Sequence, residues 1–176
     1  MPAFKKALPI AVASVLYASM IGFAGASNEH ASEALEQRNK DTVTAAFDRW
    51  SAGGSGFFEQ ILTPDVVWKI EGSTQSAGTY NGLKDFIERA VRPFATRLSE
   101  PVRPVAKHVW ADGHHVIVHW QGEGRARDGV PYRNSYAWIF RMKGEKAVEV
   151  TAFLDLAPYE DVLRRVPLPA TGGERR

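Results

Sequence analysis

Cysteine is absent from this sequence of 176 residues. The chain can therefore form no disulfide, no zinc–thiolate site and no cysteine nucleophile, and it cannot carry the lipidated cysteine of a bacterial lipoprotein. An excess of one charge is missing as well, since 22 lysines and arginines stand against 20 aspartates and glutamates. A net charge of +2 does not favour nucleic acid or an anionic membrane as a partner. Any chemistry must use oxygen and nitrogen groups.

One long apolar stretch occurs at residues 7–26, close behind Lys5 and Lys6. It closes on residues 24–26, which are alanine, glycine and alanine, a pattern typical of a secretory signal peptide cleaved before Ser27. An uncleaved membrane anchor is the alternative, because the stretch approaches the roughly 20 residues that span a bilayer. Cleavage would remove two lysines and leave balanced charge. We predict a periplasmic or secreted protein with no membrane contact after cleavage.

The remainder is predicted to be one domain, residues 27–166, with a disordered tail at 167–176. Apolar residues recur every three or four positions between Val43 and Trp50, which indicates a helix with one buried stripe. Asn81 is expected to cap a later helix, and Pro93 to bend it. The helices and strands predicted in this half are helix 32–52, helix 57–62, strand 65–71 and a helix from 82 to 94.

Beyond residue 102 the pattern changes to strands separated by short turns. The predicted strands lie at residues 105–110, 115–123, 132–142 and 147–155. An antiparallel meander is the simplest pairing of four such strands. Asp155 is placed to cap a closing helix over residues 158–165. Helices followed by a curved sheet make an α+β layout, in which the sheet wraps the helices and leaves a pocket at one end.

Three stretches carry a resemblance to a known family: residues 65–82, 132–141 and 148–155. Together with the order of elements, they resemble the SnoaL-like branch of the nuclear-transport-factor-2-like (NTF2-like) superfamily over about residues 36–166. The resemblance implies a cone-shaped α+β barrel, with a curved antiparallel sheet around N-terminal helices, a deep apolar pocket and no metal. Members include ketosteroid isomerases, limonene-epoxide-type hydrolases, polyketide cyclases, dehydratases and proteins that only bind or dimerise.

For two of these activities, this chain lacks the required catalytic groups at the approximately aligned positions. A ketosteroid isomerase needs a tyrosine donor and a carboxylate base, where this chain has Phe47 and Ile70. A limonene-epoxide-type hydrolase needs an Asp-Arg-Asp relay with a tyrosine and an asparagine. The residues standing at those positions are His119, Gln121, Ala152, Trp68 and Ile70. Neither activity is therefore predicted.

The register implied by the resemblance turns one face of two neighbouring strands into the pocket, because side chains alternate along a strand. The predicted catalytic residues are His119 as general base, Glu123 to orient its imidazole or act as acid or base, and Tyr136 to hold a developing oxyanion. The predicted substrate-binding residues are Trp68, Gln121, Asn134 and Trp138. The alternative is structural for each: a hydrogen-bonded strand histidine, backbone-bonded polar groups and core tryptophans.

A metal site would need the histidines at 108, 114, 115 and 119 together with Asp112. Because His114 and His115 are adjacent, they point to opposite faces of a strand, and surface positions are favoured. We therefore expect no metal and no other cofactor.

These observations predict an exported protein that binds a small apolar or cyclic molecule. If it is an enzyme, the expected chemistry is cofactor-free acid/base work, such as isomerisation, cyclisation, dehydration or hydrolysis, with His119 as the proton carrier. The alternative is a non-catalytic binding or dimerisation module of the same fold, and a homodimer through the outer face of the sheet is expected. His119 within reach of Glu123, Tyr136 or Asn134 would favour catalysis, whereas His119 turned to solvent would favour binding.

Overall fold

The computed structural model describes residues 16–168 of the chain, and the side chains of residues 28–168. The chain divides into two units, Met1–Ala34 and Leu35–Arg176, and each is described by itself. In the first unit, helix α1 (Leu16–Ser51) begins. Most of the predicted signal peptide and tail, residues 1–15 and 169–176, lies outside the described residues. Within the described part, no helix has the length and apolar character needed to cross a bilayer.

The second unit opens with the C-terminal half of α1, which carries the buried stripe that the sequence predicts. Val43, Ala46 and Phe47 are all at most 2% exposed. The helix begins earlier than the predicted start at residue 32. After it, the short helix α2 (Phe57–Ile61) lies as predicted.

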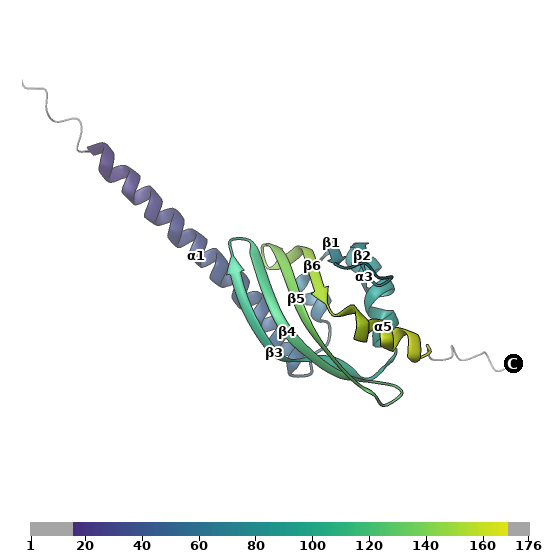
Figure 1. The fold of residues 1–176 in the computed structure, drawn as a ribbon. Coiled ribbons are helices and arrows are strands. Elements are labelled where there is room, and N and C mark those ends of the chain that lie inside the picture. The colour runs from purple at the N-terminus through teal and green to yellow at the C-terminus, as the bar shows by residue number, and fades with distance from the viewer. Residues whose placement is uncertain (1–15, 169–176) are drawn as a thin grey trace, which may run out of the picture. The chain divides into compact units, whose positions relative to one another are not determined.

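A curved six-stranded sheet forms the rest of the architecture, with the strand order β2-β1-β6-β5-β4-β3 (Figure 1). The strands are β1 (Leu62–Ile70), β2 (Gly78–Asn81), β3 (Leu98–Asp112), β4 (His115–Ala126), β5 (Pro131–Lys143) and β6 (Lys146–Leu154). The α+β class, the curved sheet and the antiparallel meander from β3 to β6 are confirmed. The sheet does not close into a barrel, because β2 and β3 remain at its edges.

Strand β1 departs from the expected antiparallel sheet. It pairs parallel with β6, so that Trp68 faces Val150, and antiparallel with β2, which lies in a stretch predicted to be loop. A parallel pair needs a long crossover connection. Here the helices between β2 and β3 and the whole meander supply it, and no local sequence pattern reports such a distant pairing.

The crossover holds one helical segment in three parts: α3 (Leu83–Phe86), the π-helical turn η1 (Ile87–Val91) and α4 (Arg92–Ala95). Pro93 lies in the first turn of α4, where its missing N–H is tolerated. The predicted helix is confirmed, but the Asn81 cap is wrong. Gly82 takes the N-cap position with no side-chain bond, and the Asp85 carboxylate instead accepts a hydrogen bond from the Asn81 backbone N–H.

The last helix, α5 (Leu156–Arg165), begins with the cap that the sequence predicts. The Asp155 side chain accepts a hydrogen bond from the Ala157 N–H at 3.0 Å. Two contacts of Tyr159 fix the helix against the crossover segment: its ring stacks on Phe94 at 4.6 Å, and its hydroxyl donates to the Ala90 carbonyl at 3.0 Å.

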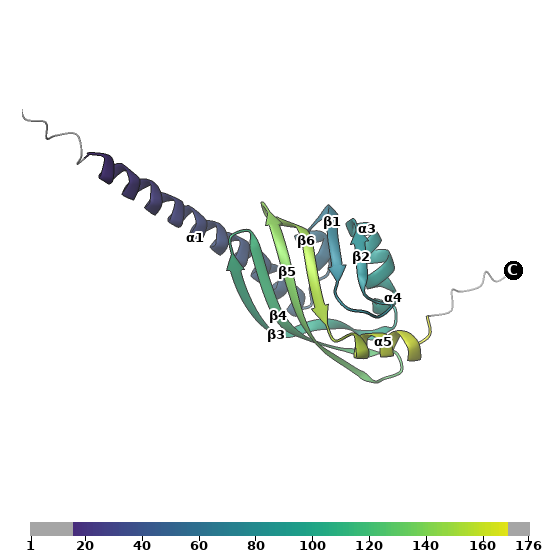
Figure 2. The ribbon, with the colours of Figure 1, turned by 45° about the horizontal axis from the view of Figure 1, so that its top comes forward.

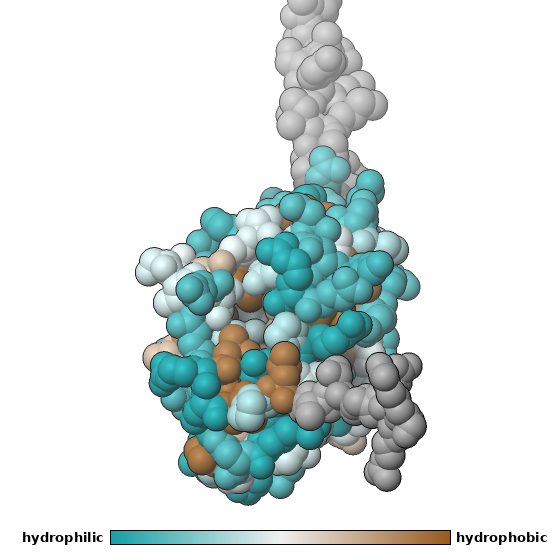
Figure 3. All heavy atoms as spheres, turned by 90° about the vertical axis from the view of Figure 1, so that its right-hand side faces the viewer, coloured by the Kyte–Doolittle hydropathy of each residue, from teal (hydrophilic) through white to brown (hydrophobic). Residues whose placement is uncertain are grey.

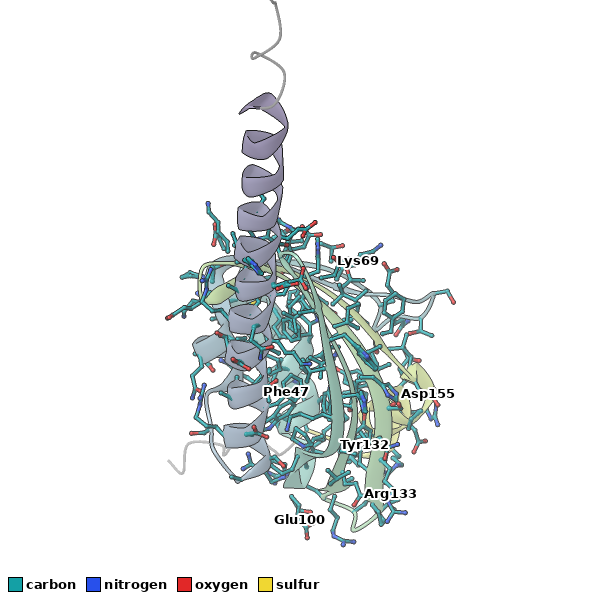
Figure 4. All side chains as sticks on the ribbon, turned by 90° about the vertical axis from the view of Figure 1, so that its left-hand side faces the viewer. Phe47, Lys69, Glu100, Tyr132, Arg133 and Asp155 are labelled. Carbon is teal, nitrogen blue, oxygen red and sulfur yellow. The ribbon has the colours of Figure 1, made fainter. Side chains whose placement is uncertain are left out.

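The core lies between the concave face of the sheet and the helices (Figure 2). It contains many aromatic rings beside its aliphatic side chains. Phe47 of α1 contacts the rings of Trp120 on β4 and Trp138 on β5, at 5.7 Å and 5.9 Å between centroids. In Figure 4, Phe47 lies between α1 and the sheet, whereas Arg133 and Glu100 lie at the periphery. On the side drawn in Figure 3, apolar side chains gather near the centre of a mostly hydrophilic surface.

Candidate functional site

A cavity of about 560 Å³ lies between the inner face of the sheet, α2 and the crossover helices. Its walls are mostly aromatic and aliphatic. The large aromatic side chains of the wall are Trp50, Phe57, Phe58, Trp68, Phe86, Phe94, Trp120, Tyr136, Trp138 and Tyr159. A volume of this size and an apolar lining are typical of small-molecule sites, which measure roughly 300–1,000 Å³.

Stacked rings give the cavity flat walls. Trp120 stacks on Tyr136 at 3.9 Å and 8° between planes, and Trp68 stacks on Phe86 at 4.2 Å and 17°. Trp138 meets both tryptophans edge to face, at 4.8 Å and 5.1 Å. Gly122 makes room for one of these stacks, because a Cβ there would lie 2.8 Å from the Trp120 ring and 3.1 Å from the Tyr136 ring.

Behind this wall lies a buried polar network on β5. The hydroxyls of Tyr132 and Tyr136 are 2.8 Å apart, and Asn134 Nδ2 donates to Tyr132 Oη at 2.8 Å. The same amide nitrogen donates to the Asp155 carbonyl. Tyr136 lines the cavity, whereas Tyr132 and Asn134 do not. Strand alternation explains the grouping, since positions 132, 134 and 136 share one face.

The phenols near the cavity stay protonated over the physiological range. Burial raises the pKa of Tyr136 well above its ordinary value, and the neighbouring Tyr132 raises it further. Burial likewise raises the pKa of Tyr132 and of Tyr159. These side chains therefore act as neutral donors or acceptors of hydrogen bonds and not as bases.

Two charged side chains belong to the lining. Arg103 is one, and its guanidinium donates to the carbonyl oxygens of Trp50, Gly53 and Gly54 at the end of α1. Glu59 is the one carboxylate among the described residues of the lining, and its side chain is exposed.

The comparisons with known proteins agree with this architecture. A family model, the SnoaL-like domain, matches residues 43–150. The chain belongs to the SnoaL-like family. No curated protein matches it.

Solved structures similar to this SnoaL-like chain share its fold. Bal32a, from a soil-derived mobile gene cassette, is 17% identical with a TM-score of 0.60, and the match covers 73% of this chain and 98% of Bal32a. A proposed SnoaL-like polyketide cyclase from Jannaschia sp. CCS1 is 18% identical with a TM-score of 0.58, covering 76% and 96%. A proposed isomerase from Bacillus subtilis is 14% identical with a TM-score of 0.60, covering 76% and 97%.

The structure brings together only part of the predicted site. Tyr136, Trp68 and Trp138 line the cavity as expected. Asn134 is buried close by, but protein groups occupy both ends of its amide, so it supports the wall and does not face a ligand.

The other three predicted residues, His119, Gln121 and Glu123, lie on the outer face of the sheet, and the expectation that they line the pocket is wrong. His119 Nε2 is 3.1 Å from Ser135 Oγ, and Glu123 pairs with Arg133 at 3.1 Å. A shift of one residue exchanges the two faces of a strand. On β4 the inward positions are even-numbered, whereas the register taken from the resemblance made them odd.

Several residues of the site were not predicted. Trp120 takes the inward place that had been assigned to His119, and Trp50, Phe58, Phe86 and Tyr159 reach the cavity from helices. The apolar alternation of Val116, Val118 and Trp120 was a signal for the first of these, because buried residues on one face recur every second position.

Metal ligands do not gather in the part of the chain that the structure describes. No group of three or more histidine, aspartate or glutamate side chains there is placed to hold an ion.

Proposed function

We propose that this SnoaL-like protein binds a small, largely apolar, ring-containing molecule in the aromatic cavity, and that it acts as a binding protein without acid/base catalysis. The observation that carries the proposal is the set of side chains that line the cavity. The flat faces of stacked rings meet two phenols that stay protonated, Tyr136 and Tyr159, while His119 points away from the cavity.

The shape of the walls favours a flat ligand. Trp68 and Trp138 stand nearly perpendicular, at 83°, so a ring inserted between such faces contacts one by stacking and the other by its edge. Burial of the ligand's apolar surface against these walls contributes about 25 cal/mol per Å² to the free energy of binding. Two similar structures are named as a polyketide cyclase and an isomerase, but at this sequence identity the similarity extends to the fold only. It does not indicate which reaction, if any, this chain catalyses.

Titration with fluorene, followed by quenching of tryptophan fluorescence, tests the proposal. We expect saturable quenching, because four tryptophans line the cavity. Ala95 is exposed and lies in the lining, so Ala95→Trp should obstruct entry and weaken fluorene binding by at least about tenfold, the equivalent of 1.4 kcal/mol.

Two control variants accompany this titration. Ala45→Trp makes the same change at an exposed position of α1 outside the lining, and His119→Ala alters the outer face. Both should bind fluorene within about twofold of the unmodified protein. Absence of saturable quenching, or equal binding by the Ala95→Trp and Ala45→Trp proteins, would contradict the proposed cavity site.

We further propose that the protein is a homodimer through the outer face of the sheet. Trp110 and Phe153 are 48% and 45% exposed there, and Ile117 and Ile139 face each other between them across β4 and β5. Ion pairs border this apolar centre: Glu123 with Arg133, and Arg141 with Glu149. An apolar centre with a charged rim is the anatomy of an interface. Each of these ion pairs contains a carboxylate and a guanidinium. A second copy of the chain, related by a two-fold axis, can therefore place its carboxylates opposite the guanidiniums of the first.

Sedimentation equilibrium measures this association. Phe153→Asp should raise the dimer dissociation constant by at least about tenfold, because it places a charge in the buried centre. Val130→Asp is the matched control, since Val130 is 47% exposed next to the turn between β4 and β5, beyond the proposed centre. A monomer at about 100 µM, where a complex of micromolar affinity is formed, would exclude the dimer.

We also propose export with cleavage before Ser27, on the pattern of Lys5, Lys6 and the apolar stretch that ends at Ala26. Expression of the full chain in a bacterium with a periplasm should yield a periplasmic protein whose intact mass corresponds to residues 27–176. A mass that includes the first 26 residues, recovered with membranes, would favour the anchor instead.

A further inference from the structure

The hydrogen bonds of Asn134 fix which way its amide points. Its Oδ1 accepts from the backbone N–H groups of Ser135 and Asp155, at 2.8 Å and 3.2 Å. Its Nδ2 donates to the Asp155 carbonyl at 2.8 Å. Backbone N–H and C=O groups have no ambiguity as donors and acceptors, so the second hydrogen of Nδ2 must be donated to Tyr132 Oη, at 2.8 Å.

The next link joins two hydroxyls, of which only one can donate to the other. If Tyr136 donated to Tyr132, the Tyr132 hydrogen would be left without an acceptor at a side chain that is 2% exposed and lies outside the cavity lining. If Tyr132 donates, the free hydrogen belongs to Tyr136, which lines the cavity. A buried donor without a partner is costly. The chain of donation therefore runs from Asn134 to Tyr132 to Tyr136.

The other polar groups buried around the cavity are also donors. The indole N–H groups of Trp68 and Trp120 are buried and have no acceptor among the described residues. Tyr159 lines the same cavity, but its hydroxyl donates to the Ala90 carbonyl. The unpaired side-chain polar atoms buried in the described part of these walls are therefore donors.

From this geometry we infer that the Tyr136 hydroxyl donates a hydrogen bond to a carbonyl oxygen of the bound molecule, so that the cavity selects ring-containing ketones over hydrocarbons of the same shape. Tyr132 and Asn134 are positioning residues, since they hold the Tyr136 oxygen and leave its hydrogen for the ligand. The inference rests on the proposed binding function and names its ligand class.

Fluorenone and fluorene form a matched pair of probes, because they share a flat ring system and differ in one carbonyl oxygen. The unmodified protein should bind fluorenone about fivefold more tightly than fluorene, the ratio expected for one neutral hydrogen bond. Tyr136→Phe should remove this preference and leave fluorene binding within about twofold, because the ring remains in the wall. Tyr80→Phe is the control: it makes the same change at a buried tyrosine outside this cavity's lining, so the preference should persist.

A second measurement detects the hydrogen bond directly. The infrared carbonyl stretch of fluorenone bound to the unmodified protein should lie at lower frequency than in an alkane, as hydrogen bonding weakens the C=O bond. In the Tyr136→Phe protein it should return toward the alkane value.

The two proposals fail in different ways. Equal affinity for both probes, with an unshifted carbonyl stretch, would overturn the hydrogen-bond inference and leave the apolar binding site standing. Failure of both probes to bind would overturn the binding function and this inference with it. A preference that survives in the Tyr136→Phe protein would assign the donor to another group.

Discussion

Replacement of Phe47 by alanine is expected to lower the free energy of unfolding by about 3–5 kcal/mol, the usual cost of deleting a buried phenyl ring. Phe47 is fully buried. Its ring contacts Phe57 at 5.0 Å, Trp120 at 5.7 Å and Trp138 at 5.9 Å, so it joins α1 and α2 to the sheet. Rings held on three elements cannot collapse together into the space that it leaves, and the void would remain.

Urea denaturation followed by far-ultraviolet circular dichroism measures this effect. Thr44→Ala, about one helical turn earlier on α1 and only half-buried, is the control. It should change the unfolding free energy by less than about 0.5 kcal/mol. A cost below about 1 kcal/mol for Phe47→Ala would show that α1 does not depend on this contact, and the account of the core would be wrong.

Removal of the Asn134 amide is expected to have the second largest effect. Asn134→Ala should lower the unfolding free energy by about 2–4 kcal/mol, because each buried group left without a partner costs roughly 1–3 kcal/mol. Four groups lose their bond: the N–H groups of Ser135 and Asp155, the Asp155 carbonyl and the Tyr132 hydroxyl. Since Asp155 caps α5, the change should also loosen that helix.

Hydrogen exchange of the α5 amides, together with denaturation, tests both parts of this expectation. Exchange should accelerate in α5 more than in β4, because the lost bonds join β5 to the cap of α5. Ser135→Ala is the matched control on the adjacent, outward-facing position, where the hydroxyl contacts His119. Unchanged protection of α5 in the Asn134→Ala protein would show that the Asp155 cap stands without the amide.

Much of the secondary structure followed from local physical rules. The buried stripe of α1, the four meander strands and the Asp155 cap depend on residues near one another in the chain, and all were predicted. The parallel pairing of β1 with β6 was not, because it joins positions about 80 residues apart and leaves no periodic trace.

The inward face of β5 was predicted correctly and that of β4 wrongly. On β5 every second residue from Tyr132 to Met142 is buried, so the pattern and the resemblance gave the same inward face. On β4, Ile117 is apolar on the outer face as well, which blurred the alternation, and the resemblance then set a register one residue away. The prediction therefore placed His119 in the cavity, where the structure has Trp120. An aromatic side chain stands where a general base was expected.

The sequence has no cysteine and no large excess of one charge. Composition limits the available chemistry before any fold exists, so any site here must be built from oxygen, nitrogen and aromatic groups. Local patterns also determined the helices, most strands and the family resemblance. Only the tertiary structure decided that the cavity is lined by stacked rings from helices and sheet, and that Tyr136 is among the lining residues. That outcome depends on the register of β4 against β5 and on contacts between residues far apart in the chain.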